Sequence, residues 1–130
     1  MRPLTKKGQA QAVELVALFR KFTIAAVFTS PYLRCVQTVE PLARAHKLEA
    51  RTSSDLAEGH GLEGLHRFLD DSKLDHAVLC THGDIVWELV DDLVARHVIR
   101  AGEGGFEKGS TWVLAMKGGT IAKARYLSAP

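Results

Sequence analysis

The sequence predicts an α/β fold, a three-layer sandwich with a mixed, mainly parallel sheet and a C-terminal hairpin. Segments with a helical spacing of apolar residues alternate with short apolar stretches of strand length. Residues 77–80 are four consecutive apolar residues, which is typical of a parallel strand that is buried on both faces. Two strand-like stretches separated by a glycine pair end the chain and indicate the hairpin. With 130 residues, the chain is expected to form one domain over residues 1–130.

The first helix is predicted to begin after Thr5, because threonine often caps helix N-termini. Apolar residues then recur in two rows as far as Phe22, which favours a helix packed on a sheet and on a neighbouring helix. A strand is predicted over 25–29. Pro31 ends this strand, because proline has no N–H to donate to the ladder.

The second helix is expected to start near Leu33. Pro41 removes one of its backbone hydrogen bonds, so we expect a kink or a restart of the helix at that point. Residues 48–52 are a possible short edge strand. Residues 53–64 contain three glycines and have the composition of a loop, and a weak helix is predicted over 65–70.

The second half of the chain begins with the strand at 77–81. Apolar residues at helical spacing predict a helix after it, to about residue 98. Residues 110–116 and 121–127 are the predicted hairpin strands, joined by a tight turn at 117–120.

The composition excludes several classes of function. The chain has 46% apolar and 25% charged residues, as an ordinary globular protein does. A net charge of +2, with no basic run interleaved with aromatic residues, argues against nucleic-acid binding. No apolar run approaches the ~18 residues of a membrane span, and a signal-peptide core is missing, so we expect a cytoplasmic protein with no membrane partner. Cys35 and Cys80 have no metal-ligand spacing and are expected to be reduced core thiols.

Two predicted strand ends carry side chains suited to phosphate. The carboxyl ends of parallel strands lie at one edge of a sheet, so Ser30 and His82 are expected together there. His82 would also face the N-terminus of the following helix, where anions bind. Arg34 follows Ser30 by about one helical turn, so its guanidinium can reach over this edge and hold two phosphate oxygens. Glu58, brought beside a phosphate, could protonate a leaving oxygen.

Each of these side chains also has a purely structural interpretation. An arginine early in a helix is usually a solvated surface residue, and a histidine in a turn can simply bond to a neighbouring loop. Most carboxylates in glycine-rich loops are solvated as well. His60 and His66, with Glu63 between them, match no standard zinc spacing, so no metal site is predicted.

Several short motifs occur in order along nearly the whole chain. They are Arg2-Pro3-Leu4-Thr5-Lys6-Lys7-Gly8, Ser30-Pro31-Tyr32-Leu33-Arg34-Cys35-Val36-Gln37-Thr38, Leu56-Ala57-Glu58 and Thr81-His82-Gly83-Asp84. With these motifs the chain resembles the histidine phosphatase superfamily, also called phosphoglycerate-mutase-like. The segment 108–114 is most similar to phosphatase domains that are fused to Nudix hydrolase domains.

The resemblance implies phosphoryl transfer to histidine without a metal or other cofactor. In the family, the imidazole of an Arg-His-Gly or Arg-His-Ala motif takes the phosphoryl group, and water then releases it. Arg34 matches the arginine that holds the phosphoryl oxygens, and His82 matches the second histidine, which stabilises the transferred group. Glu58 matches the acidic residue that protonates the leaving group and then activates water. The implied partner is a phosphorylated small molecule or a phosphohistidine protein.

The family's nucleophile is missing from its expected place. In the family it ends a strand upstream of the first helix, whereas here Met1 directly precedes Arg2, and the Arg96-His97 dipeptide falls late in a predicted helix. We therefore expect an N-terminally incomplete, truncated phosphatase domain, impaired or inactive as written. The alternatives are a pseudoenzyme that binds phosphorylated ligands and an interaction module. Without the family's first strand, the sheet would have an open edge through which the chain could form a homo-oligomer.

Overall fold

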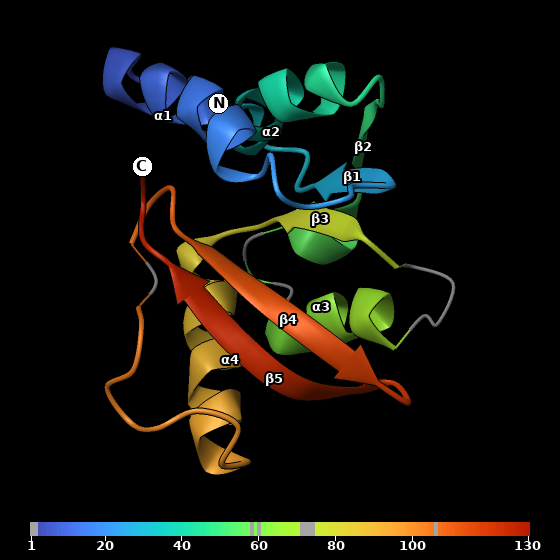
Figure 1. The fold of residues 1–130 in the computed structure, drawn as a ribbon, viewed down its shortest axis with the longest axis vertical. Coiled ribbons are helices and arrows are strands. Elements are labelled where there is room, and N and C mark those ends of the chain that lie inside the picture. The colour runs from blue at the N-terminus through green and yellow to red at the C-terminus, as the bar shows by residue number, and fades with distance from the viewer. Residues whose placement is uncertain (1–2, 58, 60, 71–74, 106) are drawn as a thin grey trace.

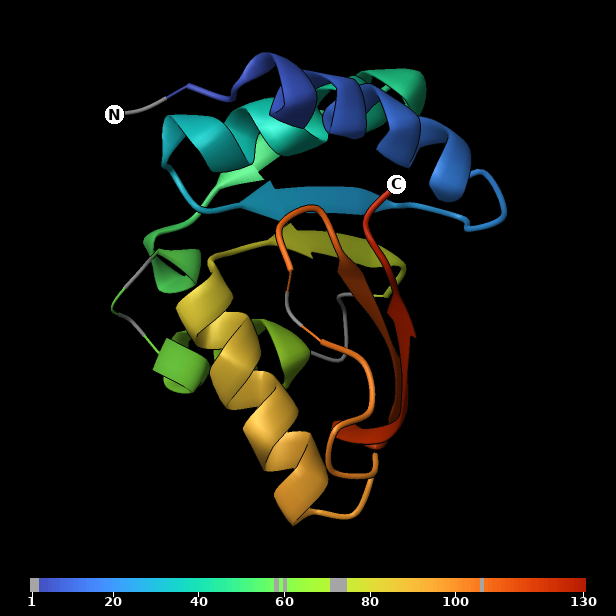
Figure 2. The same cartoon turned by 90° about the vertical axis from the view of Figure 1, so that its left-hand side faces the viewer.

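Helices cover both faces of a parallel sheet in the computed structural model of the chain (Figure 1). α1 (Lys6–Leu18) and α2 (Leu33–Ala45) lie on one face, and α3 (Gly61–Leu69) and α4 (Gly83–Ala95) lie on the other, as Figure 2 shows from a second direction. This arrangement confirms the predicted α/β sandwich. The structure describes residues 3–57, 59, 61–70, 75–105 and 107–130.

β1 (Ala26–Thr29) is the central strand of the parallel sheet. β2 (Ala50–Thr52) pairs with it on one side and β3 (Ala77–Cys80) on the other, both in parallel. Parallel neighbours need crossover connections, and α2 and α3 lie in these crossovers. The register pairs Thr29 with Cys80, so the carboxyl ends of β1 and β3 lie side by side.

The C-terminal hairpin forms a sheet of its own. β4 (Thr111–Lys117) and β5 (Thr120–Leu127) pair in antiparallel fashion, and within the described ranges β3 has β1 as its one strand neighbour. Gly118 and Gly119 form the turn with φ values of 60° and 80°, a conformation that glycine adopts without strain. The hairpin lies over α3 and α4 in Figure 1 and closes the core on that side.

The parallel sheet separates two apolar cores, which explains why β1 and β3 are mainly apolar on both faces. The core beneath the hairpin contains the buried residues Leu56, Leu65, Ile85, Leu89, Leu93, Ile99 and Ile121. The core beneath α1 and α2 contains the buried residues Leu15, Phe19, Val27, Val39, Leu42 and Ala43. Across the described part of the chain, no helix is both long and apolar enough to span a bilayer.

α1 and α2 begin where the sequence signals predict. The Thr5 hydroxyl accepts a hydrogen bond from the Gly8 N–H at 3.1 Å and caps α1 as expected. α2 continues through Pro41 without the restart that was one of the two predicted outcomes. The proline removes one backbone donor. Buried neighbours, Val39 and Leu42, anchor the helix on either side of it and maintain its path.

The predicted loop over 53–64 is wrong in part. A 3-10 helix, η1 (Ser54–Leu56), lies near its start, and α3 begins at Gly61 instead of residue 65. The physical reason is Gly64, which packs so closely on η1 that a Cβ there would overlap the carbonyl oxygen of Asp55. Glycine is therefore required here for the close approach of two segments, and it does not mark a loop.

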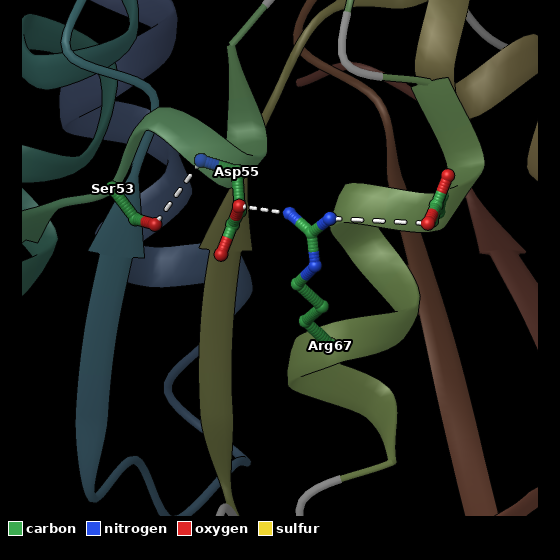
Figure 3. A network of polar contacts seen from close by, with 4 residues as sticks. Ser53, Asp55 and Arg67 are labelled. Carbon is green, nitrogen blue, oxygen red and sulfur yellow. Dashed lines mark hydrogen bonds and ion pairs between the residues drawn. The ribbon is translucent and has the colours of Figure 1, made fainter.

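One ion pair joins the same two segments, and two further polar contacts hold its partners in place (Figure 3). The Arg67 guanidinium on α3 donates to the Asp55 carboxylate at 2.5 Å and lies 3.9 Å from the Glu63 carboxylate. The Asp55 N–H donates to the Ser53 hydroxyl at 3.3 Å. Because the Arg67 side chain is 56% exposed, water screens these ion pairs, and the packing at Gly64 is the stronger constraint.

Candidate functional site

The carboxyl ends of β1 and β3 bring two polar side chains together, as the sequence predicts. The Ser30 hydroxyl oxygen lies 2.8 Å from Nε2 of His82, and both residues are buried. The Ser30 N–H donates to the Cys80 carbonyl at 2.9 Å, which extends the strand pairing up to the site. This backbone contact holds the two strand ends side by side.

His82 is enclosed by the segment that leads from β1 into α2. The Tyr32 ring meets the imidazole edge to face, with ring centroids 4.7 Å apart and an interplanar angle of 72°. The Cys35 sulfur lies 3.8 Å from Nε2. His82 is also the N-cap residue of α4, where the first N–H groups of the helix have no partner within the helix. His82 therefore lies at the end of α4 where the helix dipole is positive.

Arg34 is the second residue of α2, directly before Cys35. The contact between Cys35 and His82 places this first turn of α2 beside His82. The Arg34 side chain is half-buried, and among the described residues no carboxylate forms an ion pair with it.

The third predicted site residue, Glu58, lies outside the described residues, as do Arg2 and His60. The residues near it in sequence are tied to the His82 segment. The Thr81 hydroxyl donates to the Leu56 carbonyl at 2.7 Å, and the Gly59 N–H donates to the Asp84 carboxylate at 3.3 Å.

Sequence reasoning did not identify Tyr32 and Cys35 as neighbours of His82, and it placed Ser30 there without a role. The only available signal was that all three lie in one short stretch beside Arg34. The distances themselves come from the parallel register and from the angle at which α2 leaves the sheet, neither of which is encoded in a local motif.

The arrangement can bind an oxyanion. An imidazole fixed by a hydroxyl, a guanidinium on the adjacent helix turn and the N-terminus of α4 all favour negative charge. Such preorganised groups can also stabilise charge that develops on a transferred group.

Comparisons with known proteins identify similar sequences. The profile of the histidine phosphatase superfamily (branch 1) matches residues 2–68, about half of the chain, and this range includes Ser30 and Arg34. An 8-oxo-(d)GTP phosphatase of Mycolicibacterium smegmatis is 34% identical over 134 residues, an alignment that covers 99% of the chain and 42% of that protein. The chain thus spans less than half the length of this relative.

Proposed function

Because the chain belongs to the histidine phosphatase superfamily, we propose that Arg34 and His82 bind the phosphoryl group of a phosphate monoester or a phosphohistidine. The observation that carries this proposal is the 2.8 Å contact between Ser30 and His82 across two strand ends. It fixes one imidazole beside the helix turn that carries Arg34. Family membership and a relative named as a phosphatase support phosphatase-like chemistry.

Phosphoryl transfer depends mainly on positioning and on stabilising negative charge. The planar Arg34 guanidinium can donate two parallel hydrogen bonds to two phosphoryl oxygens. Ser30 positions His82, because a hydroxyl at Nε2 restricts the rotation of the ring. A ring N–H of the imidazole can donate a hydrogen bond to the transferred group and stabilise its negative charge. Glu58 is the proposed acid that protonates the leaving oxygen.

The full reaction of the family passes through a phosphohistidine, which water then cleaves. Within residues 1–130 the one Arg-His dipeptide is Arg96-His97, at the C-terminal end of α4. This end lies about 20 Å along the helix from His82, given a rise of about 1.5 Å per residue. We therefore propose that residues 1–130 by themselves bind phosphate without turnover.

The ligand class is a phosphorylated small molecule or protein. The name of the relative supports a nucleoside phosphate as one candidate. Phosphohistidine and simple phosphate esters are the others, and the proposed contacts with the phosphoryl group are common to all three.

The test is a titration with inorganic orthovanadate, followed through the imidazole resonances by NMR. We expect saturable binding with a shift of the His82 ring signals, and binding at least ~10-fold weaker in His82→Asn, since a hydrogen bond to a charged group is worth about 1.5–3 kcal/mol. Ser30→Ala should weaken binding less, because it frees the ring without removing it.

His97→Asn is the matched control. His97 is exposed and has a φ of 61°, a conformation that asparagine tolerates, so this variant should bind vanadate like the unchanged chain. Equal binding by His82→Asn and the unchanged chain would contradict the proposal.

A second candidate function is an interaction module, favoured by the outer edge of β3. This strand is apolar throughout and has neither a charged residue nor a proline, the usual protections of an edge strand. A second copy of the chain is the proposed partner. Light scattering should then show a dimer whose fraction rises with concentration, and a strict monomer at every concentration would exclude this function.

A further inference from the structure

The two cysteines of the chain lie on facing elements beside the candidate site. Cys35 is buried on the side of α2 that carries Val39 and Ala43, one and two helical turns further on. Cys80 ends β3 and packs against the core residues Val27, Val39 and Ala43. Both side chains therefore point into the same layer between α2 and the sheet.

Contacts at atomic distance support this pairing. The Cys35 sulfur lies 3.9 Å from the carbonyl oxygen of Thr81, the residue that follows Cys80. The pKa of Cys80 is raised well above its ordinary value, first by a hydrogen bond between the two thiols and then by burial. In this structure Cys35 and Cys80 are not joined by a disulfide.

We propose that Cys35 and Cys80 form a reversible intramolecular disulfide that links α2 to β3 and changes the surroundings of His82. The two cysteines lie outside the proposed phosphate contacts, and the proposal does not depend on phosphate binding. It concerns a covalent bond between two core thiols, which can be measured whether or not phosphate binds.

The oxidant is a hydroperoxide, and each step balances. The Cys35 thiolate attacks one peroxide oxygen, the O–O bond breaks, and a sulfenic acid forms on Cys35 while the second oxygen leaves as hydroxide. Cys80 then attacks this sulfur and gives up its proton, the S–S bond forms, and the S–O bond breaks to release water. The two thiols lose two electrons in total, and the peroxide takes them up.

The geometry assigns the order of these steps. Cys35 faces the imidazole of His82 at 3.8 Å, and this base can accept its proton. Cys80 remains protonated, because its raised pKa disfavours the thiolate, so it acts second. Once the disulfide forms, the Cys35 sulfur is fixed beside Cys80, and its contact with Nε2 of His82 changes.

The experiment treats the native chain with a small excess of hydrogen peroxide and counts free thiols. We expect both thiols to disappear, with a mass lower by two hydrogens and a cross-linked peptide pair after proteolysis. Dithiothreitol should restore both thiols. The disulfide should raise the Tm by roughly 10 °C. It should also shift the His82 ring resonances, a readout that needs no phosphate ligand.

Controls distinguish this pair from two unrelated thiols. Cys35→Ser and Cys80→Ser should each lose the peptide pair and show no rise in Tm on oxidation. The same peroxide dose is also applied to the chain unfolded in urea, where loss of both free thiols shows that the dose is sufficient. Persistence of both thiols in the native chain at a dose that oxidises the unfolded chain would overturn the proposal. Cross-links between two chains in place of the intramolecular bond would overturn it as well.

Discussion

Replacement of Arg34 by alanine is expected to weaken orthovanadate binding about 10- to 100-fold, as the loss of hydrogen bonds to a charged group predicts. The guanidinium lies on the helix turn that Cys35 anchors beside His82, and within the described residues no carboxylate neutralises it. Calorimetric titration of both proteins measures the change. Arg34→Lys should recover only part of the affinity, because an ammonium group does not match two oxygens at once.

Arg44→Ala is the control for this prediction. Arg44 lies on the same helix, in its last turn, and is exposed to solvent. The variant removes the same charge from the opposite end of α2, so any general electrostatic effect on anion binding appears in both variants. If Arg44→Ala weakens binding as much as Arg34→Ala, then Arg34 has no specific contact with the anion.

The second large effect is on stability. Gly64→Ala is expected to lower the free energy of unfolding by about 1–3 kcal/mol, as overpacking of a buried position does. The added Cβ would overlap the backbone carbonyl of Asp55, and a backbone atom cannot move aside as the end of a flexible side chain can. η1 and α3 would have to separate, with loss of the Arg67–Asp55 ion pair. Urea unfolding followed by circular dichroism measures the change.

Gly83→Ala is the matched comparison. Gly83 is also helical, at the start of α4, but no atom lies within 4 Å of the position that its Cβ would take. Alanine is the better helix former, so this variant should be unchanged or slightly more stable. If the two variants are equally stable, the close contact at Gly64 does not constrain the fold.

Most of the architecture could be predicted from local patterns. The apolar run at β3 and the helical spacing in α4 identify a buried strand followed by an amphipathic helix. Thr5 marks the start of α1, and the glycine pair 118–119 marks the hairpin turn. These signals succeed because each depends on a few neighbouring residues.

The place of the site at the sheet edge could be predicted, but the distances between its side chains could not. The edge shared by Ser30 and His82 follows from the rule for parallel strands, but their 2.8 Å contact depends on a register set by packing. The contact between Cys35 and His82 depends on the position of α2 over the sheet. The glycines near α3 were misleading, because glycine permits both loops and close packing, and only the tertiary contact at Gly64 distinguishes the two.

The parallel pairing of β1 with β3 also determines when the site can exist during folding. Ala26 pairs with Ala77, so a chain segment of about fifty residues must close before the two strands meet. The antiparallel hairpin needs only a two-residue turn and can form much earlier. We therefore expect Ser30 and His82 to meet late in folding. A ligand that binds both strand ends would then slow unfolding of the whole domain, because it would hold together a contact with a large loop-closure cost.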